Sequence, residues 1–272
     1  MKDLSNVIFI TDMDGTLLPA NKRLNQKDLD AIYDFRKFGG RFTVATGRTV
    51  QSASQYFSTL KLDEPMIVLN GGAIYDCKEK KYAWQNFVDL SAYEAVKDIL
   101  EKFPKVGAEI DLSDEILVPQ YSIQEEYHID ISYKDIVPRS ADIKDISPEG
   151  WCKVLFAADP DEIDKLTDYT QNKGWNNLTF VRSSKYFYEI LPNGCSKGIA
   201  LKRMLELYYG YGYTVAACGD FNNDIEMLQN ANIPIAPANA LDEVKKIACM
   251  VTKADCDNGA VAEAIYYVMN VL

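Results

Sequence analysis

The chain has 272 residues, of which 47% are hydrophobic and 25% are charged, so it is long enough to bury one large core or two modest ones. Its formal net charge is −11 and its lysines and arginines form no block, which disfavours nucleic acid and anionic lipid as partners. The six cysteines form no CxxC pair, and no apolar run reaches the length of a membrane span, so we expect a cytoplasmic protein with reduced, mostly buried thiols.

Strand and helix patterns alternate in the first third of the chain. Residues 7–11 form an apolar, β-branched run that is typical of a strand buried on both faces of a parallel sheet. A helix capped by Asn25 is expected to run to Phe38, and a second helix is expected over residues 50–60. Further strands are predicted at residues 41–45 and 66–69. This alternation predicts a parallel sheet with crossover helices.

The middle of the chain has a different pattern, in which aromatic residues, charges and short alternating runs favour mixed α+β structure. Helices are expected at residues 92–103 and 160–173, a strand at 153–157, and a hairpin formed by 180–182 and 186–191. The acid-rich stretches 109–115 and 142–145 are expected to face solvent.

After Pro192 the α/β alternation returns. Helices are expected at residues 197–208, 225–230, 241–248 and 260–272, and strands at 213–217 and 233–236. We therefore predict an α/β protein with a Rossmann-like parallel-sheet core, built from residues 1–82 and 189–272. An α+β domain, residues 83–188, is inserted into this core.

Polar side chains follow four of the predicted core strands. These residues are Asp12 and Asp14, Thr46, Asn70, and Asp220 with Asn223 and Asp224 just beyond it. Ligands bind beyond the carboxyl ends of the strands in open parallel sheets. The string Asp-x-Asp-Gly-Thr by itself describes a turn equally well. Three acids that converge at strand ends would repel one another without a cation, however, and carboxylate oxygens suit Mg²⁺, so the pattern predicts a magnesium site.

A phosphoryl group also needs donors and positive charge around its oxygens. Thr46 offers a hydroxyl group, Gly47 an unobstructed backbone N–H, and Lys197 a mobile charge at the start of a helix. Taken alone, each is better explained as a loop or solvated residue. The single histidine, His128, has no triad or metal partner in the pattern, so we expect a surface or packing residue.

The order of these motifs resembles the haloacid dehalogenase (HAD) superfamily over nearly the whole chain. The motifs are Asp-Met-Asp-Gly-Thr (12–16), Ala-Thr-Gly-Arg (45–48), Asn-Gly-Gly (70–72), Gly-Cys-Ser-Lys-Gly (194–198) and Gly-Asp-Phe-Asn-Asn-Asp (219–224). The sequence is most similar to the Cof-type sugar-phosphate phosphatases with a type IIB cap. This resemblance implies a phosphatase of small phosphorylated metabolites, with sugar phosphates favoured, and makes the inserted domain the cap.

The resemblance also implies roles for the residues that match the motifs. Asp12 would be the nucleophile that forms an aspartyl-phosphate, and Asp14 the general acid and base. The implied ligands of Mg²⁺ are Asp12, the backbone carbonyl of Asp14, and Asp220, with Asn223 or Asp224 ligating the ion or orienting its waters. Thr46, Gly47, Lys197 and Asn70 would hold the phosphoryl group.

Two alternative functions stay open. A phosphomutase or phosphotransferase on the same fold would pass the phosphoryl group to a sugar instead of water. A non-catalytic sensor would only bind phosphate esters, but mere binding needs no acid/base residue such as Asp14. No motif in the inserted domain identifies the substrate.

Overall fold

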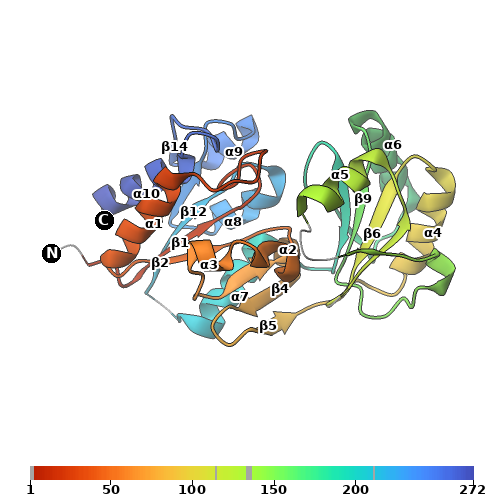
Figure 1. The fold of residues 1–272 in the computed structure, drawn as a ribbon, viewed down its shortest axis with the longest axis horizontal. Coiled ribbons are helices and arrows are strands. Elements are labelled where there is room, and N and C mark those ends of the chain that lie inside the picture. The colour runs from red at the N-terminus through yellow and green to blue at the C-terminus, as the bar shows by residue number, and fades with distance from the viewer. Residues whose placement is uncertain (1–2, 114, 133–136, 211) are drawn as a thin grey trace. The chain divides into compact units, whose positions relative to one another are not determined.

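The computed structural model describes residues 3–113, 115–132, 137–210 and 212–272. Its contacts divide the chain into two compact units, whose helices and strands are labelled in Figure 1. The core unit contains residues 1–47, 56–84 and 196–272, and the inserted unit contains residues 48–55 and 85–195. The sequence pattern places the inserted domain at residues 83–188, and those boundaries stay a prediction.

The core unit is built on a five-stranded sheet in the order β14-β13-β12-β1-β2, with every neighbouring pair parallel. Its strands are β1 (Val7–Thr11), β2 (Arg41–Val44), β12 (Thr214–Cys218), β13 (Ile233–Ala236) and β14 (Met250–Val251). Every residue of β1 is buried, as the apolar run predicts. Thr11 pairs with both Cys218 and Val44, so the carboxyl ends of β12, β1 and β2 lie side by side.

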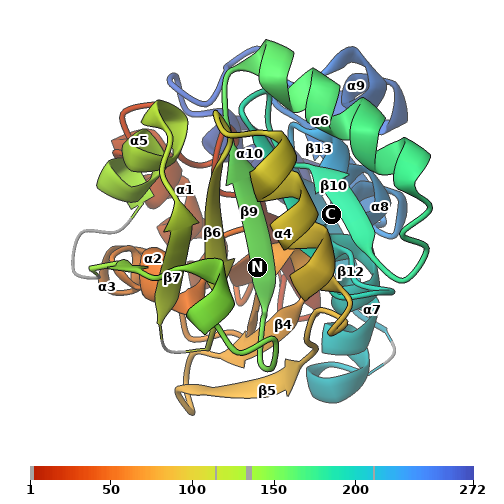
Figure 2. The same ribbon diagram turned by 90° about the vertical axis from the view of Figure 1, so that its right-hand side faces the viewer.

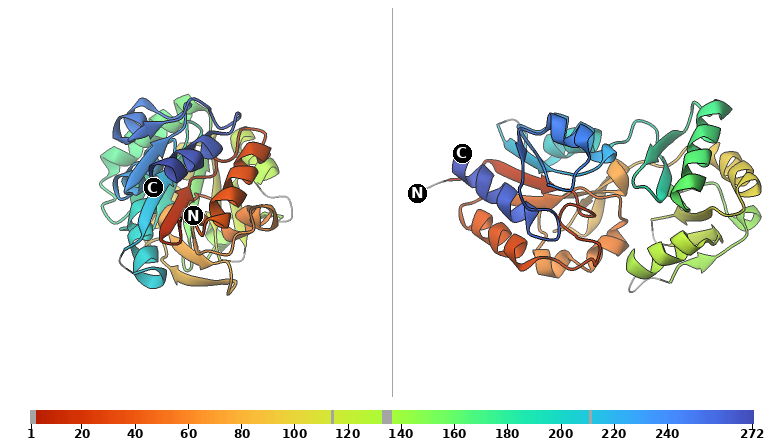
Figure 3. Two further views of the ribbon diagram at one scale, coloured as in Figure 1. Left: turned by 90° about the vertical axis from the view of Figure 1, so that its left-hand side faces the viewer. Right: turned by 90° about the horizontal axis from the view of Figure 1, so that it is seen from above.

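Helices flank this sheet. They are α1 (Gln26–Lys37), α3 (Phe57–Leu60), α7 (Lys197–Tyr208), α8 (Ile225–Gln229), α9 (Asp242–Ile247) and α10 (Ala260–Val271). The side chain of Asn25 accepts a hydrogen bond from the Lys27 N–H at 3.0 Å, which confirms the predicted cap of α1. Helices α1 and α10 pack against each other, as Figure 3 shows near the C-terminus.

The strand predicted at residues 66–69 has a different partner from the one expected. β3 (Met66–Val68) pairs antiparallel with β4 (Ala73–Asp76), and β5 (Lys81–Gln85) completes a three-stranded sheet. Among the described residues, a bridge between Ala45 and Ile67 links this sheet to the parallel strands. The chain reverses at Leu69 and Asn70, whose φ angles of 55° and 53° are left-handed. This tight reversal forms the hairpin that the strand-helix alternation did not predict.

The helix predicted over residues 50–60 is two short helices, α2 (Val50–Ser54) and α3. Side chains in this segment compete for the backbone carbonyls that a continuous helix would use. The Ser54 hydroxyl donates to the Gln51 carbonyl at 2.6 Å, and the Gln55 amide donates to the Ser52 carbonyl at 3.0 Å. The prediction of one helix was therefore wrong at its centre.

The inserted unit contains a six-stranded mixed sheet in the order β10-β11-β9-β6-β7-β8. Its strands are β6 (Gly107–Asp111), β7 (Ile116–Gln120), β8 (Arg139–Ser140), β9 (Lys153–Ala157), β10 (Thr179–Arg182) and β11 (Phe187–Leu191). Figure 2 shows α4 (Ala92–Lys102) and α6 (Pro160–Lys173) covering one face of this sheet. Together with the parallel core sheet, this mixed sheet confirms the predicted fold class.

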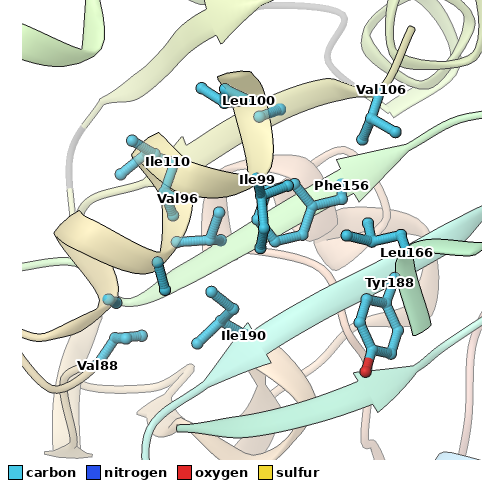
Figure 4. Close-up of a cluster of buried hydrophobic side chains, with 14 of the residues drawn as sticks. Val88, Val96, Ile99, Leu100, Val106, Ile110, Phe156, Leu166, Tyr188 and Ile190 are labelled. Carbon is cyan, nitrogen blue, oxygen red and sulfur yellow. The ribbon is translucent and has the colours of Figure 1, made fainter. Parts of the chain in front are cut away.

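Alternate strand residues of the inserted unit form its hydrophobic core with α4 and α6 (Figure 4). The strands supply Ala108 and Ile110, Val154 and Phe156, and Tyr188 and Ile190, and the helices supply Val96, Ile99, Leu100, Ile163 and Leu166. This period of two is the one expected of strands with one face against helices. Residues between them in the sequence therefore point to the other face.

Charged residues are buried on that other face, which corrects the expectation for the stretch 109–115. Glu109 and Asp111 are both buried instead of facing solvent. Asp111 pairs in register with Lys153, whose Nζ lies 3.4 Å from Asp111 Oδ2, so a neighbouring cation offsets the cost of burial. His128 of α5 (Ile123–Ser132) lies 2.6 Å from Glu109 Oε1 and packs edge-on against the Phe187 ring, as a packing residue would. Asp114 lies outside the described residues.

Two further expectations concern the chain as a whole. The six cysteines, all within the described residues, form no disulfide, and five of them are buried while Cys249 is exposed. Among the helices that the structure describes, none is long and apolar enough to cross a bilayer.

Candidate active site

The loops that follow β1 and β12 meet at the carboxyl edge of the core sheet. The backbone N–H of Asp12 donates to the Cys218 carbonyl at 2.8 Å, which holds Asp12 beside the start of the Gly219–Asp220 loop. Gly15 turns the first loop with a φ of +90°, and a Cβ there would lie 2.6 Å from Asp220 Oδ2. Only glycine therefore allows this loop to come so close to Asp220.

Lys197 lies between two carboxylates at the first turn of α7. Its Nζ is 2.5 Å from Asp12 Oδ1 and 2.6 Å from Asp224 Oδ1, and the whole residue is buried. Burial acts against the charged ammonium group, but the carboxylates of Asp12 and Asp224 outweigh it and raise the pKa of Lys197. The lysine is therefore a fixed positive charge in contact with Asp12, and not a solvated helix residue.

Three carboxylates of the site could hold a metal ion. Asp12, Asp220 and Asp224 each offer an oxygen atom, and these atoms lie within 4.8 Å of one another. Burial, opposed by Lys197 and reinforced by the charges of Asp224 and Asp220, raises the pKa of Asp12 well above its ordinary value. Burial and repulsion from Asp224 raise the pKa of Asp220 to about 7. A bound cation would offset both effects, and an all-oxygen donor set suits a hard divalent ion.

Hydrogen bonds orient two of these carboxylates. The Thr16 hydroxyl donates to Asp220 Oδ1 at 2.6 Å. Asp224 Oδ2 accepts from the backbone N–H groups of Asp220 and Phe221, at 3.0 and 3.2 Å. With its other oxygen on Lys197, Asp224 anchors the loop and the lysine at once, and this contact agrees with a supporting position for Asp224.

Asp14 completes the set of acids but has a different partner. Its Oδ1 lies 2.6 Å from Nζ of Lys22, and its side chain is 37% exposed. The site thus contains four carboxylates, with Asp12, Asp220 and Asp224 as the other three, and two ammonium groups, those of Lys22 and Lys197. When all are ionised, two negative charges remain, which is the charge that one divalent cation balances.

The predicted phosphate ligands lie at the next strand ends. The Asn70 N–H donates to the Thr46 carbonyl at 3.0 Å, and the Asn223 amide donates to Asn70 Oδ1 at 2.9 Å. A Cβ at Gly47 would lie 2.9 Å from Asn70 Nδ2, so glycine is needed for this close approach. The left-handed φ of Asn70 is uncommon outside glycine, and such conformations cluster at functional sites.

The core unit therefore contains every residue that the motifs predicted for the site. Sequence reasoning did not predict a place in the site for Thr16 or for Lys22, although a motif pointed to Thr16. Thr16 is part of the Asp-x-Asp-Gly-Thr string, so its position beside the acids was readable from the motif. Lys22 belongs to no motif and lies eight residues beyond Asp14, and no pattern could have paired them.

Comparison with known proteins agrees with this geometry. A family model described as haloacid dehalogenase-like hydrolase matches residues 9–265. The chain belongs to this family. Three examples show how far the similarity extends.

The first relative is the 5-amino-6-(5-phospho-D-ribitylamino)uracil phosphatase YitU of Bacillus subtilis, which is 23% identical over 252 residues and covers 91% of this chain and 92% of its own. The second is the HMP-PP phosphatase of Serratia proteamaculans, which is 27% identical over 269 residues and covers 94% of this chain and 93% of its own. The third is the solved structure of the HAD subclass IIB sugar phosphatase BT4131, with a TM-score of 0.81 at 20% identity, covering 96% of this chain and 98% of its own.

These findings confirm the predicted superfamily and the predicted fold, while the Cof-type subfamily IIB stays a prediction. They also confirm that this haloacid dehalogenase-like hydrolase is an enzyme of the phosphatase class. Small phosphorylated molecules are the class of substrate for such an enzyme.

Proposed function

We propose that this hydrolase is a Mg²⁺-dependent phosphomonoester phosphatase, which works through an aspartyl-phosphate on Asp12 and favours sugar phosphates among small metabolites. The observation that carries the proposal is the contact of Lys197 Nζ with Asp12 Oδ1 at 2.5 Å, inside a cluster of carboxylates. A lysine in this position favours the ionised form of Asp12 and brings positive charge to the atom that attacks phosphorus.

In the first step, an oxygen of Asp12 attacks phosphorus while the bond from phosphorus to the ester oxygen breaks. Negative charge develops on the oxygens of the transferring group. The Lys197 ammonium, the Thr46 hydroxyl, the Gly47 N–H and the Asn70 amide are the donors that would surround these oxygens. Asn223 supports this arrangement because its amide holds Asn70 through a hydrogen bond at 2.9 Å.

Asp14 handles the protons of both steps. Its carboxyl group gives a proton to the departing alkoxide oxygen in the first step. In the second step it takes a proton from water, whose oxygen attacks phosphorus and breaks the bond to Asp12. Inorganic phosphate leaves, and Asp12 returns to its ionised form.

The donor set described above fits Mg²⁺. Asp12, Asp220 and the backbone carbonyl of Asp14 would hold the ion, while Asn223 or Asp224 would ligate it or orient its waters. Mg²⁺, when bound, supplies charge neutralisation for the phosphoryl oxygens. Asp224 already orients Lys197 and the Asp220 loop through both of its oxygens.

The inserted domain, residues 83–188, is proposed as the cap that selects the substrate. Its role rests on the family resemblance and not on a motif. We therefore expect the residues that select the substrate to be identified by comparing the turnover of phosphorylated sugars with that of other phosphorylated metabolites.

The proposal is tested by measuring inorganic phosphate released from a panel of sugar phosphates and from 4-nitrophenyl phosphate. We expect stoichiometric release that stops with EDTA and returns when Mg²⁺ is added in excess. Isomerisation of a sugar phosphate without phosphate release would support the mutase instead. If esters of the panel bind but none of them is hydrolysed, the result would support the non-catalytic sensor. Turnover that persists in EDTA would remove Mg²⁺ from the mechanism.

A further inference from the structure

Lys22 contacts the side chain of Asp14 but belongs to none of the motifs. The distance from its Nζ to Asp14 Oδ1 is 2.6 Å, and the two side chains are 21% and 37% exposed. Asp14 is thus the most accessible carboxylate of the site, since Asp12, Asp220 and Asp224 are largely withdrawn from solvent. A carboxylate that is partly exposed keeps rotational freedom unless a neighbour fixes it.

The backbone around Lys22 is itself held in place. Lys22 has a left-handed φ of 57°, and its N–H donates to the Pro19 carbonyl at 2.9 Å. Its carbonyl accepts a hydrogen bond at 3.1 Å from the hydroxyl of Tyr56, a buried residue of a distant segment. A non-glycine residue persists in this conformation only where its surroundings determine it. The turn therefore presents the lysine side chain from a fixed base.

We propose that Lys22 is a positioning residue, whose ammonium group donates to Asp14 Oδ1 and leaves Oδ2 to carry the proton that passes to the leaving-group oxygen. This inference rests on the proposed function of Asp14 as the general acid. The two lysines then have separate tasks, because Lys197 contacts Asp12 and Asp224 while Lys22 contacts Asp14. Lys22 acts through Asp14 and not on the phosphoryl group.

This division of tasks has a kinetic signature. An alkyl phosphate has a poor leaving group, whose oxygen must be protonated as its bond to phosphorus breaks. An activated aryl phosphate leaves as a stable phenolate and needs little protonation. Loss of the residue that positions Asp14 should therefore slow alkyl esters more than aryl esters. Loss of a phosphoryl ligand should slow both equally.

The main test compares wild type with Lys22→Met, which removes the ammonium group but keeps an unbranched side chain on the same left-handed backbone. The substrates are 4-nitrophenyl phosphate and the alkyl phosphate of the panel that wild type turns over fastest. We expect kcat to fall about 30-fold for the alkyl ester and no more than about 3-fold for the aryl ester. Lys22→Arg should restore most of the alkyl activity, since arginine keeps the charge.

Two further variants make the test specific. Lys37→Met is the matched control, because Lys37 pairs with Asp34 at 3.1 Å on α1 and should leave both rates unchanged. Tyr56→Phe removes the hydroxyl that holds the Lys22 carbonyl and should slow the alkyl ester selectively, by about 3-fold. This second variant keeps the inference testable if Lys22→Met fails to fold in a thermal unfolding assay.

The outcomes separate the inference from the proposed function. Selective loss on the alkyl ester, rescued by Lys22→Arg, supports it. Equal loss on both esters with weaker inhibition by inorganic phosphate would make Lys22 a phosphoryl ligand and overturn the inference. Wild-type rates for both esters in Lys22→Met would overturn it as well. If wild type itself releases phosphate from neither ester, the proposed function fails first.

Discussion

Each of the two units contains a buried lysine beside a pair of acids, and the two sites differ in how closely the charges meet. In the core unit, Lys197 Nζ lies 2.5 Å from Asp12 and 2.6 Å from Asp224, with a hydrogen bond to each. In the inserted unit, Lys153 Nζ lies 3.4 Å from Asp111 and 4.0 Å from Glu189. Both lysines are almost fully withdrawn from solvent.

The difference follows from where the acids lie on their elements. Asp111 and Lys153 face each other from neighbouring antiparallel strands, so the register of the sheet sets their spacing. Asp12 lies in a loop and Asp224 in a short 3₁₀ helix, both beyond strands, where the chain can bring them onto one ammonium group and add Asp220 as a third acid. Loops allow the convergence that chemistry needs, while strands give a fixed pairing that neutralises charge. We therefore expect the core cluster to control turnover and the inserted cluster to control stability.

Asp12→Asn should give the largest effect on turnover. The amide keeps the shape of the side chain but is not a nucleophile, so kcat with 4-nitrophenyl phosphate should fall at least about 10³-fold. Released phosphate measures the loss, and a thermal unfolding curve with one cooperative transition shows that the variant is folded. Activity near that of wild type would remove Asp12 as the nucleophile and with it the contrast between the two clusters.

Lys197→Met should damage both turnover and stability. It leaves the Asp12 and Asp224 carboxylates buried without their cation, which should lower the free energy of unfolding by about 4 kcal/mol. The lost charge should also lower kcat of the folded enzyme by about 10²-fold. Urea titration gives the first quantity and phosphate release the second. A folded variant that keeps more than about a third of the wild-type kcat would contradict a contact between Lys197 and the phosphoryl group.

Much of the core sheet could be predicted from the sequence, because buried parallel strands are contiguous apolar runs. Residues 7–11 form β1 as expected, and the helix capped by Asn25 forms as α1. The hairpin of β3 and β4 was missed because the Asn70-Gly71 turn signal was interpreted as the end of a parallel strand, and because Leu69, which is also left-handed, carries no turn signal. The burial of Glu109 and Asp111 was missed for another reason. Their side chains contact Lys153 and His128, which are distant in sequence.

The site was predictable where its residues share a short motif. Asp12, Asp14 and Thr16 fall in one string of five residues, and Asp220, Asn223 and Asp224 in another of six. Contacts between residues of different motifs could not be predicted in the same way. The contact of Lys197 with Asp12 joins residues 185 positions apart, and the Lys22–Asp14 pair depends on the path of an irregular loop.

Lys153→Met should affect stability without affecting the chemistry. Burial, with repulsion from Glu109, raises the pKa of Asp111 to about 6, and removing the lysine leaves this acid without its cation. We expect the free energy of unfolding to fall by about 3 kcal/mol and kcat with 4-nitrophenyl phosphate to stay within about 3-fold of wild type. The double variant Lys153→Met/Asp111→Asn should recover part of the lost stability. A kcat loss as large as that of Lys197→Met would abolish the distinction between the two lysines.

Another buried acid, Asp28, shows what a carboxylate costs without a lysine. Asp28 of α1 accepts the Ala262 N–H at 2.7 Å in the first turn of α10, and no salt bridge to it occurs within the described residues. Its Oδ2 is buried and has no hydrogen-bond partner there. Burial raises the pKa of Asp28 to about 6, from an ordinary value of 3.8.

Asp28→Asn should therefore change how stability depends on pH. Because the native state binds this proton more tightly than the unfolded state, wild type gains from protonated Asp28 at low pH and loses that gain as the pH rises from about 4 to about 6. Asparagine keeps an acceptor for the Ala262 N–H and does not titrate. Urea titrations at several pH values should show the variant gaining about 2 kcal/mol relative to wild type between about pH 4 and about pH 7. Asp30→Asn, which removes an exposed charge from the same helix, is the matched control and should show no such gain. A difference between Asp28→Asn and wild type that is constant over this range would mean that the pKa of Asp28 is the same in the folded and the unfolded state, and that burial of this carboxylate carries no such cost.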